Sequence, residues 1–104
     1  MSSADWKPLL DEEPDNELVR FTYAKSLMDE ESWVPAMEQF KILIRDNPDY
    51  VIAWAFLARC ALNAGDRDLA RKACEDGLPH ARRLNHEIPL AEIDAVLQEL
   101  DSEF

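Results

Sequence analysis

The sequence has little glycine, cysteine and lysine, and it lacks any long apolar run. Gly65 and Gly77 are the two glycines among 104 residues, which leaves no glycine-rich loop to hold a phosphate group. No apolar run approaches the roughly 18 residues of a membrane-spanning helix, and the polar start of the chain is unlike a secretory signal. Cys60 and Cys74 are too few for a disulfide framework, so we expect two reduced core cysteines in a cytoplasmic protein.

Acidic residues outnumber basic residues 22 to 11, which gives a formal net charge of −11. Residues 1–19 and 87–104 carry six acids each, whereas residues 20–86 are balanced with ten acids and ten bases. Such a chain repels phosphate backbones, which argues against nucleic acid and anionic membranes as partners. We expect the acidic ends to be solvated surface. Adaptation to high salt is the weaker alternative, suggested by four lysines against seven arginines.

Helical periodicity without strand-like alternation predicts an all-α chain. The expected helices cover residues 4–12, 16–28, 33–46, 50–64, 69–84 and about 88–101. Their expected N-caps are Asp15 or Asn16 for the second helix, Ser32 for the third, Asp49 for the fourth, and Asp66 or Asp68 for the fifth.

Proline and glycine mark further details of these helices. Gly65 is expected to end the fourth helix in a left-handed conformation. Pro79 predicts a kink near residues 75–79 or a brief break, because it removes a helical hydrogen bond. The last helix is expected to begin around Pro89 and to carry one apolar stripe formed by Leu90, Ile93, Leu97 and Leu100.

A spacing of 34 residues organises the middle of the chain. Pro14 and Pro48 are 34 residues apart, and each is followed by an aspartate. Alanines recur at the same spacing, as Ala24 with Ala58 and as Ala36 with Ala70. Periods of this length are typical of helical repeats that stack on one another to bury their apolar faces.

The residues at these offsets carry a resemblance to a known family. The first unit supplies Tyr23, Ala24, Leu27, Ala36, Phe40, Leu43 and Pro48, and the second supplies Trp54, Leu57, Ala58, Gly65 and Ala70. Over residues 14–78 the chain resembles the tetratricopeptide repeat (TPR) family, and its layout is similar to that of small stand-alone bacterial TPR proteins. The resemblance implies an α-α superhelix of two TPR helical hairpins with a short N-terminal helix and a C-terminal capping helix. A single domain is expected, with repeats at about 15–48 and 49–82.

Four positions depart from equivalence between the units. Arg20 stands where the second unit has Trp54, and Glu31 stands where it has Gly65. Cys74 and Gly77 stand where the first unit has Phe40 and Leu43. The second unit is therefore expected to close differently from the first.

The sequence offers no arrangement of residues for catalysis or metal binding. His80 and His86 do not share a helical face and have no cysteine at ligand spacing. The acidic run at residues 29–31 lacks the spaced oxygen ligands and the glycine of a calcium loop. No serine or cysteine is spaced for a nucleophile and base, so we expect no enzyme activity, no cofactor and no metal.

The resemblance instead implies a concave groove built from the first helix of each repeat. It places Leu18, Phe21, Lys25, Met28 and Asp29 there from the first repeat, and Ile52, Ala55, Phe56, Arg59 and Asn63 from the second. Lys25 and Arg59 occupy equivalent offsets beside apolar anchors, which would suit a peptide with an apolar side chain and a carboxylate. Two alternatives stay open. The cations could only balance Asp29 and nearby acids, or the leading segment or final helix could cover Phe21 and Phe56.

These features predict a non-enzymatic protein-interaction module that holds a peptide or a partner helix in its groove. Self-association is an alternative, through Trp6, Leu9 and Leu10 or through the last helix, and it would give a homodimer. A small acidic chaperone or escort protein is a further alternative.

Overall fold

The computed structural model describes residues 1–102, and in that part of the chain six α-helices are the only regular elements. They are α1 (Ser3–Glu12), α2 (Glu17–Asp29), α3 (Trp33–Asp46), α4 (Val51–Asn63), α5 (Arg67–Leu84) and α6 (Glu87–Asp101). The predicted all-α class is confirmed. The bounds of α3 are those expected from the sequence, whereas α6 begins two residues before Pro89.

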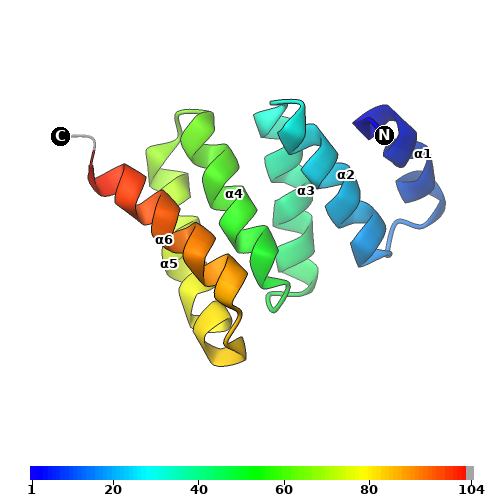
Figure 1. The fold of residues 1–104 in the computed structure, drawn as a ribbon. Coiled ribbons are helices and arrows are strands. Elements are labelled where there is room, and N and C mark those ends of the chain that lie inside the picture. The colour runs from blue at the N-terminus through cyan, green and yellow to red at the C-terminus, as the bar shows by residue number, and fades with distance from the viewer. Residues whose placement is uncertain (103–104) are drawn as a thin grey trace.

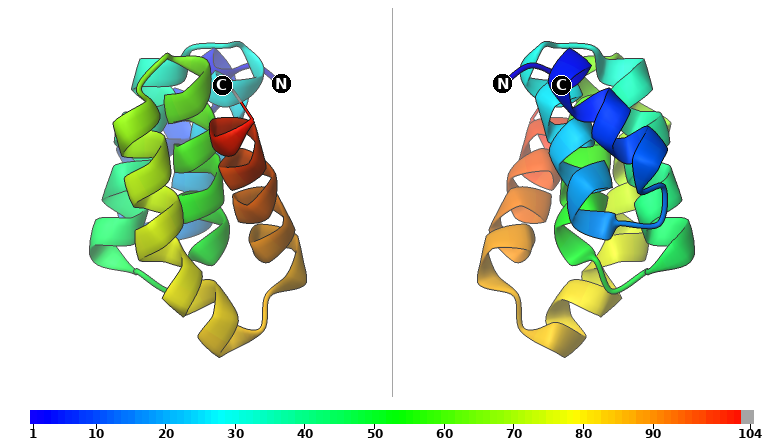
Figure 2. Two further views of the ribbon diagram at one scale, coloured as in Figure 1. Left: turned by 90° about the vertical axis from the view of Figure 1, so that its left-hand side faces the viewer. Right: turned by 90° about the vertical axis from the view of Figure 1, so that its right-hand side faces the viewer.

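The helices form two layers (Figures 1 and 2). Helices α2, α4 and α6 make one layer, and α3 and α5 lie behind them. Each helix packs against its neighbour in sequence within α2–α3, α3–α4 and α4–α5, while α6 packs against both α4 and α5. Helix α1 packs against α2 at the opposite end of the array. We call the layer of α2, α4 and α6 the inner layer. Helix α4 lies in its middle, with α2 on one side and α6 on the other.

Local sequence starts two of these helices as expected. The side chain of Asn16 accepts a hydrogen bond from the Val19 amide, and that of Asp66 accepts one from the Leu69 amide. Ser32 is the N-cap of α3, but its side chain makes no capping hydrogen bond. The prediction that Asp49 caps α4 is wrong, because α4 begins at Val51 after Tyr50.

The turns that follow α2 and α4 have the same geometry although their residues differ. Gly65 has φ of +87°, and Glu31, at the equivalent offset, has φ of +61°. In both turns the next amide reaches back into the helix: Ser32 donates to the Leu27 carbonyl, and Asp66 donates to the Ala61 carbonyl. The left-handed turn expected at Gly65 is confirmed. The first unit forms the same turn with Glu31 in place of glycine, and the Cβ of Glu31 adds a steric cost in this left-handed conformation.

The core lies between the layers and contains the alanines of the repeat. Ala24, Ala36, Ala58 and Ala70 are each 0% exposed. Phe40, the bulky residue of the first unit, is also 0% exposed. Because the four alanines have no side chain beyond Cβ, the paired helices can approach closely there, which is why alanine recurs at the 34-residue spacing.

Helix α5 runs without a break from Arg67 to Leu84, so the brief break predicted as one outcome at Pro79 is wrong, and the other outcome, a kink near residues 75–79, stays a prediction. Gly77, two residues before that proline, is buried against α4. A Cβ added to Gly77 would lie 2.5 Å from Cβ and 2.8 Å from Cγ of Trp54. Glycine is therefore required here by a close helix–helix contact.

The buried face of α6 differs in phase from the predicted stripe. Ile93 and Leu100 are buried as expected, but Leu90 and Leu97 are only partly buried. Pro89 and Val96 complete the buried stripe in their place. Because α6 packs against both α4 and α5, its buried face contacts two neighbours. The sequence of α6 alone does not determine where the centre of that buried face lies.

Replacing Glu31 with glycine should stabilise the protein, because it removes the Cβ from a left-handed residue. We expect the free energy of unfolding to rise by about 1 kcal/mol in urea denaturation. The matched control is Glu31→Ala, which removes the same charge but keeps the Cβ. A gain of equal size in both variants would show that charge, and not backbone conformation, is responsible.

Gly77→Ala should destabilise the protein even though alanine is the better helix former. Overpacking against the fixed Cβ of Trp54 costs roughly 1–3 kcal/mol, more than the helix-propensity gain of up to about 1 kcal/mol. Thermal or urea unfolding measures the difference, with Glu75→Ala on the exposed side of α5 as the control. An unchanged or raised stability in Gly77→Ala would contradict the close contact.

Candidate functional site

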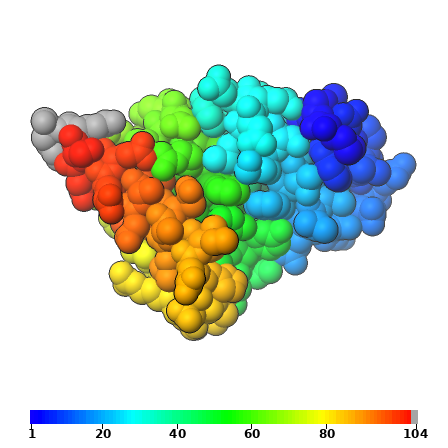
Figure 3. All heavy atoms as spheres, in the orientation of Figure 1, coloured from blue at the N-terminus to red at the C-terminus, as the bar shows by residue number. Residues whose placement is uncertain are grey.

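The residues expected in a groove lie on the inner layer formed by α2, α4 and α6. Figure 3 shows atoms of α4 between those of α2 and α6 on this surface, which we call the inner face. Leu18, with 67% of its surface exposed, and Asn63 are open to solvent. Asp29 is exposed as well, and six further predicted residues are partly buried: Phe21, Lys25, Met28, Ile52, Phe56 and Arg59. Ala55, also named from the resemblance, is completely buried and belongs to the core.

An aromatic cluster supports the middle of the inner face. The ring centroids of Phe21 and Phe56 are 6.0 Å apart, with an interplanar angle of 18°. Phe40 lies 5.9 Å from Phe56, and Tyr50 lies 5.6 Å from Phe21. These neighbours from α3 and from the start of α4 are what partly cover Phe21. Tyr50 is a member of this surface that the repeat offsets did not identify.

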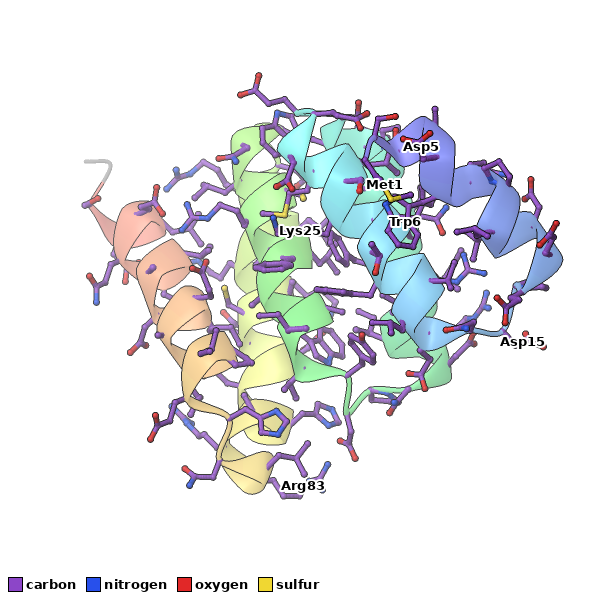
Figure 4. The ribbon with its side chains drawn as sticks, turned by 45° about the vertical axis from the view of Figure 1, so that its right-hand side comes forward. Met1, Asp5, Trp6, Asp15, Lys25 and Arg83 are labelled. Carbon is purple, nitrogen blue, oxygen red and sulfur yellow. The ribbon has the colours of Figure 1, made fainter. Side chains whose placement is uncertain are left out.

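Lys25 is held by contacts within its own surface. Its Nζ lies 2.6 Å from Oδ1 of Asp29, one helical turn away, and 5.8 Å from the centroid of the Phe56 ring. Figure 4 shows this side chain reaching from α2 over α4. The sequence left open whether Lys25 balances Asp29, and the structure shows this ion pair. The carboxylate of Asp29 is itself 62% exposed.

Arg59 pairs with a residue that the sequence did not point to. Its guanidinium contacts the carboxylate of Glu99, which comes from α6. Helical spacing puts Ile88, Glu92 and Ala95 on the same side of α6 as Glu99. Helix α6 therefore borders the inner face in addition to capping the core. No local pattern reveals this pair, because its members are 40 positions apart in the chain.

The two ion pairs of the inner face meet solvent mainly through their acidic members. Glu99 is 51% exposed and Asp29 is 62% exposed, so water screens both pairs and each adds little to stability. The cations are less exposed than their partners, at 20% for the Arg59 side chain and 39% for the Lys25 side chain.

One end of the inner face is hollowed between the starts of α4 and α6. A depression of about 240 Å³ is lined by Asp49, Tyr50, Val51, Ile52, His86 and Pro89. A second one of about 350 Å³ is formed by residues 85–89. Ile88 beside them is 74% exposed. These hollows extend the inner face beyond the residues found from the repeat offsets.

The two histidines are placed differently. The His80 ring stacks on Trp54 with centroids 5.9 Å apart, and its Nδ1 lies 3.0 Å from Oδ1 of Asp49. Arg83 also contacts Asp49, which explains why this carboxylate does not cap α4. His86 is exposed at the start of α6. Within residues 1–102 no three His, Cys, Asp or Glu side chains come together in a way that could hold a metal ion.

The segments offered as self-association surfaces are largely used within the chain. Leu10 is 5% exposed and Trp6 is half-buried, which leaves Leu9, at 37%, as the exposed member of that group. Ser3 ties α1 to the α2–α3 turn, since its amide and hydroxyl both donate to the Glu30 carboxylate at 2.7 Å. These hydrogen bonds, first from the amide and then from the hydroxyl, lower the pKa of Glu30.

Comparison with known proteins gives the family. A TPR repeat-containing protein of Pseudomonas aeruginosa is 31% identical over 87 residues, which cover 84% of this chain and 83% of that protein. The chain belongs to the TPR family. The solution structure of a protein from Bordetella parapertussis matches 97% of this chain and 88% of its own, with a TM-score of 0.83 and 29% identity. No family profile matches the chain.

Membership of the TPR family assigns this chain to the protein-interaction modules, as the resemblance implied. The structural match covers almost the whole chain, so α1 and α6 belong to the same fold as the repeats. None of the helices in residues 1–102 is both long and apolar enough to cross a membrane. The TPR fold alone does not identify a partner.

Both cysteines are buried without exposed surface, and their chemistry follows from that. Burial raises the pKa of the Cys60 thiol to about 12, and it raises that of Cys74 to about 11. The Cys74 thiol also donates to the Ile93 carbonyl at 3.8 Å, which links α5 to α6. At neutral pH both thiols are protonated. Both cysteines are free and lie in the core, as the sequence predicted.

The buried thiols should make the TPR domain less stable at high pH. A raised pKa means that the fold prefers the protonated thiol, so this contribution is complete below pH about 9. It is lost as the pH rises towards about 11 and 12. We expect the free energy of unfolding to fall more steeply above pH 9 in the wild type than in Cys60→Ala/Cys74→Ala. Parallel slopes, or rapid reaction of the native protein with a thiol reagent at pH 8, would contradict this assignment.

Proposed function

We propose that this TPR protein is a non-enzymatic interaction module that binds a peptide or a partner helix on its inner face. The single observation that carries this proposal is the pair of cations at equivalent offsets on α2 and α4. Lys25 lies over the Phe56 ring, and Arg59 lies on the next helix against α6. The proposed ligand-contacting set remains Leu18, Phe21, Lys25, Met28, Ile52, Phe56, Arg59 and Asn63.

The chemistry of this surface favours a partner with a carboxylate next to apolar side chains. Each cation has an exposed acidic partner that such a carboxylate would displace. Leu18 and Ile88 add exposed apolar surface at either edge. Three inner helices offer a small contact, which we expect to bury less than about 1,200 Å² and to bind in the micromolar range.

Removing both cations should weaken binding while leaving the fold intact. The test compares proteins retained from native lysate by the wild type and by Lys25→Gln/Arg59→Gln, quantified by mass spectrometry. We expect one or more proteins to be retained by the wild type and reduced at least tenfold by the variant, as the loss of two charge-assisted contacts implies.

A matched control uses cations away from the inner face. Lys7 on α1 and Lys72 on α5 make the same kind of i,i+4 pair as Lys25, with Asp11 and Asp76. The variant Lys7→Gln/Lys72→Gln changes the net charge by the same amount and should retain the same proteins as the wild type. Equal losses in both variants would assign the effect to net charge and reject the inner face as the binding site.

A further inference from the structure

A depression of about 520 Å³ lies outside the inner face, where the start of α2 meets the end of α3. Its lining is Pro14, Asp15, Glu17, Arg20, Leu43, Arg45, Asp46 and Asn47. Figure 4 places Asp15 on the α1–α2 connection, away from Lys25. None of the residues proposed for the inner face contributes to this lining.

The 34-residue period identifies the same place in the second unit. Shifted by 34, the lining residues become Pro48, Asp49, Val51, Trp54, Gly77, Pro79, His80 and Ala81. In that unit the place is occupied by the chain itself. The Trp54 indole stacks on the His80 ring at 5.9 Å and 11°, above the space that Gly77 leaves. The two units therefore give a filled and an unfilled version of one site.

One hydrogen bond is common to both versions. Trp54 Nε1 donates to the Pro48 carbonyl at 2.8 Å, and the Arg20 guanidinium donates to the Pro14 carbonyl at the same distance. A second guanidinium nitrogen of Arg20 donates to the side chain of Gln39. The planar guanidinium of Arg20 is thus held at both edges in the place of the indole. Such a group presents a flat face on which an aromatic ring can stack.

The ring that would stack on it is missing from the first unit. The position equivalent to His80 is Asp46, whose carboxylate is paired with Arg45 at 2.9 Å. Leu43, which stands where the second unit has Gly77, is 2% exposed. The depression therefore combines a planar cation held at both edges with open space, and a short aspartate side chain stands where the other unit has a ring.

We propose that this depression, the α2–α3 slot, receives an aromatic side chain of a partner protein. A tryptophan or tyrosine ring would lie on the flat face of the Arg20 guanidinium. The lining carries three acids and two arginines, and one of those acids already pairs with Arg45. The Glu17 carboxylate accepts a hydrogen bond from the Asn47 side-chain amide at 2.9 Å. The negative charges of Asp15 and Glu17 disfavour an anionic ring. The slot is a second contact site, separate from the inner face, and it does not depend on the carboxylate proposed there.

The test titrates ¹⁵N-labelled protein with N-acetyl-tryptophanamide and follows amide chemical shifts. We expect saturable shifts centred on the slot, at Glu17, Leu43 and Asn47. N-acetyl-leucinamide is the matched aliphatic probe and should cause no saturable shift there. Equal shifts with both probes, or no saturable shift with either, would overturn the proposal.

Two variants separate stacking from other causes. Arg20→Lys keeps the charge but loses the planar face, and it should weaken N-acetyl-tryptophanamide binding roughly fivefold. Arg20→Trp/Leu43→Gly rebuilds the first unit with the residues of the second and should abolish binding, because its own indole occupies the site. Since the double variant could fold poorly, Arg20→Lys carries the decision. Unchanged affinity in Arg20→Lys would overturn the proposal.

A third variant distinguishes the slot from the inner face. Lys25→Gln/Arg59→Gln should retain the slot shifts with unchanged affinity. Loss of these shifts would show that the probe binds the inner face and would overturn the slot as a separate site. Conversely, failure of the inner-face proposal in lysate experiments would leave the slot titration unaffected.

Discussion

The close approach of paired helices at four alanines is the constraint on which the fold depends. Ala24, Ala36, Ala58 and Ala70 have no exposed surface, and a larger side chain at any of them would overpack its helix contact by roughly 1–3 kcal/mol. Because α2 packs on α3 and α4 on α5 in this way, the inner helices come to lie side by side in one layer. Helix α6 can then rest on both α4 and α5. The inner face is thus a consequence of small residues that lie buried in the core.

The helices were predictable because their signals are local, whereas several of their contacts are not. Periodicity and turn residues gave all six helices, and Asn16 caps α2 as expected. Asp49 looked like a cap of the same kind, but its carboxylate is taken by His80 and Arg83, which are 31 and 34 residues away. The buried stripe of α6 was placed wrongly at Leu90 and Leu97 for a related reason. A helix that packs on two neighbours has no single apolar direction that its own sequence could reveal.

The candidate site shows the same division between local and distant partners. The pairing of Lys25 with Asp29 follows from i,i+4 spacing and could be read from the sequence. The pairing of Arg59 with Glu99 could not, because it exists only after α6 has folded back onto α4. Repeat offsets therefore identify which positions share a face, but they leave open what neutralises the charges there. In this TPR domain the terminal helix supplies part of that answer, so its role extends beyond covering the core.

The differences between the two units are coupled substitutions rather than independent losses of a motif. Trp54 at its position excludes any side chain at residue 77, because a Cβ there would lie 2.5 Å from the tryptophan Cβ. Arg20 at the equivalent position permits Leu43, which is buried, and it keeps the hydrogen bond to the preceding proline carbonyl. What the two units share at this position is therefore a side-chain hydrogen bond to the preceding proline carbonyl, and not a residue type. Arg20 with Leu43 provides the donor to the Pro14 carbonyl but leaves the α2–α3 slot open at the surface. In the second unit, the stacked rings of Trp54 and His80 occupy the equivalent place. The two repeats of this protein consequently have the same backbone arrangement but present different side chains at the surface.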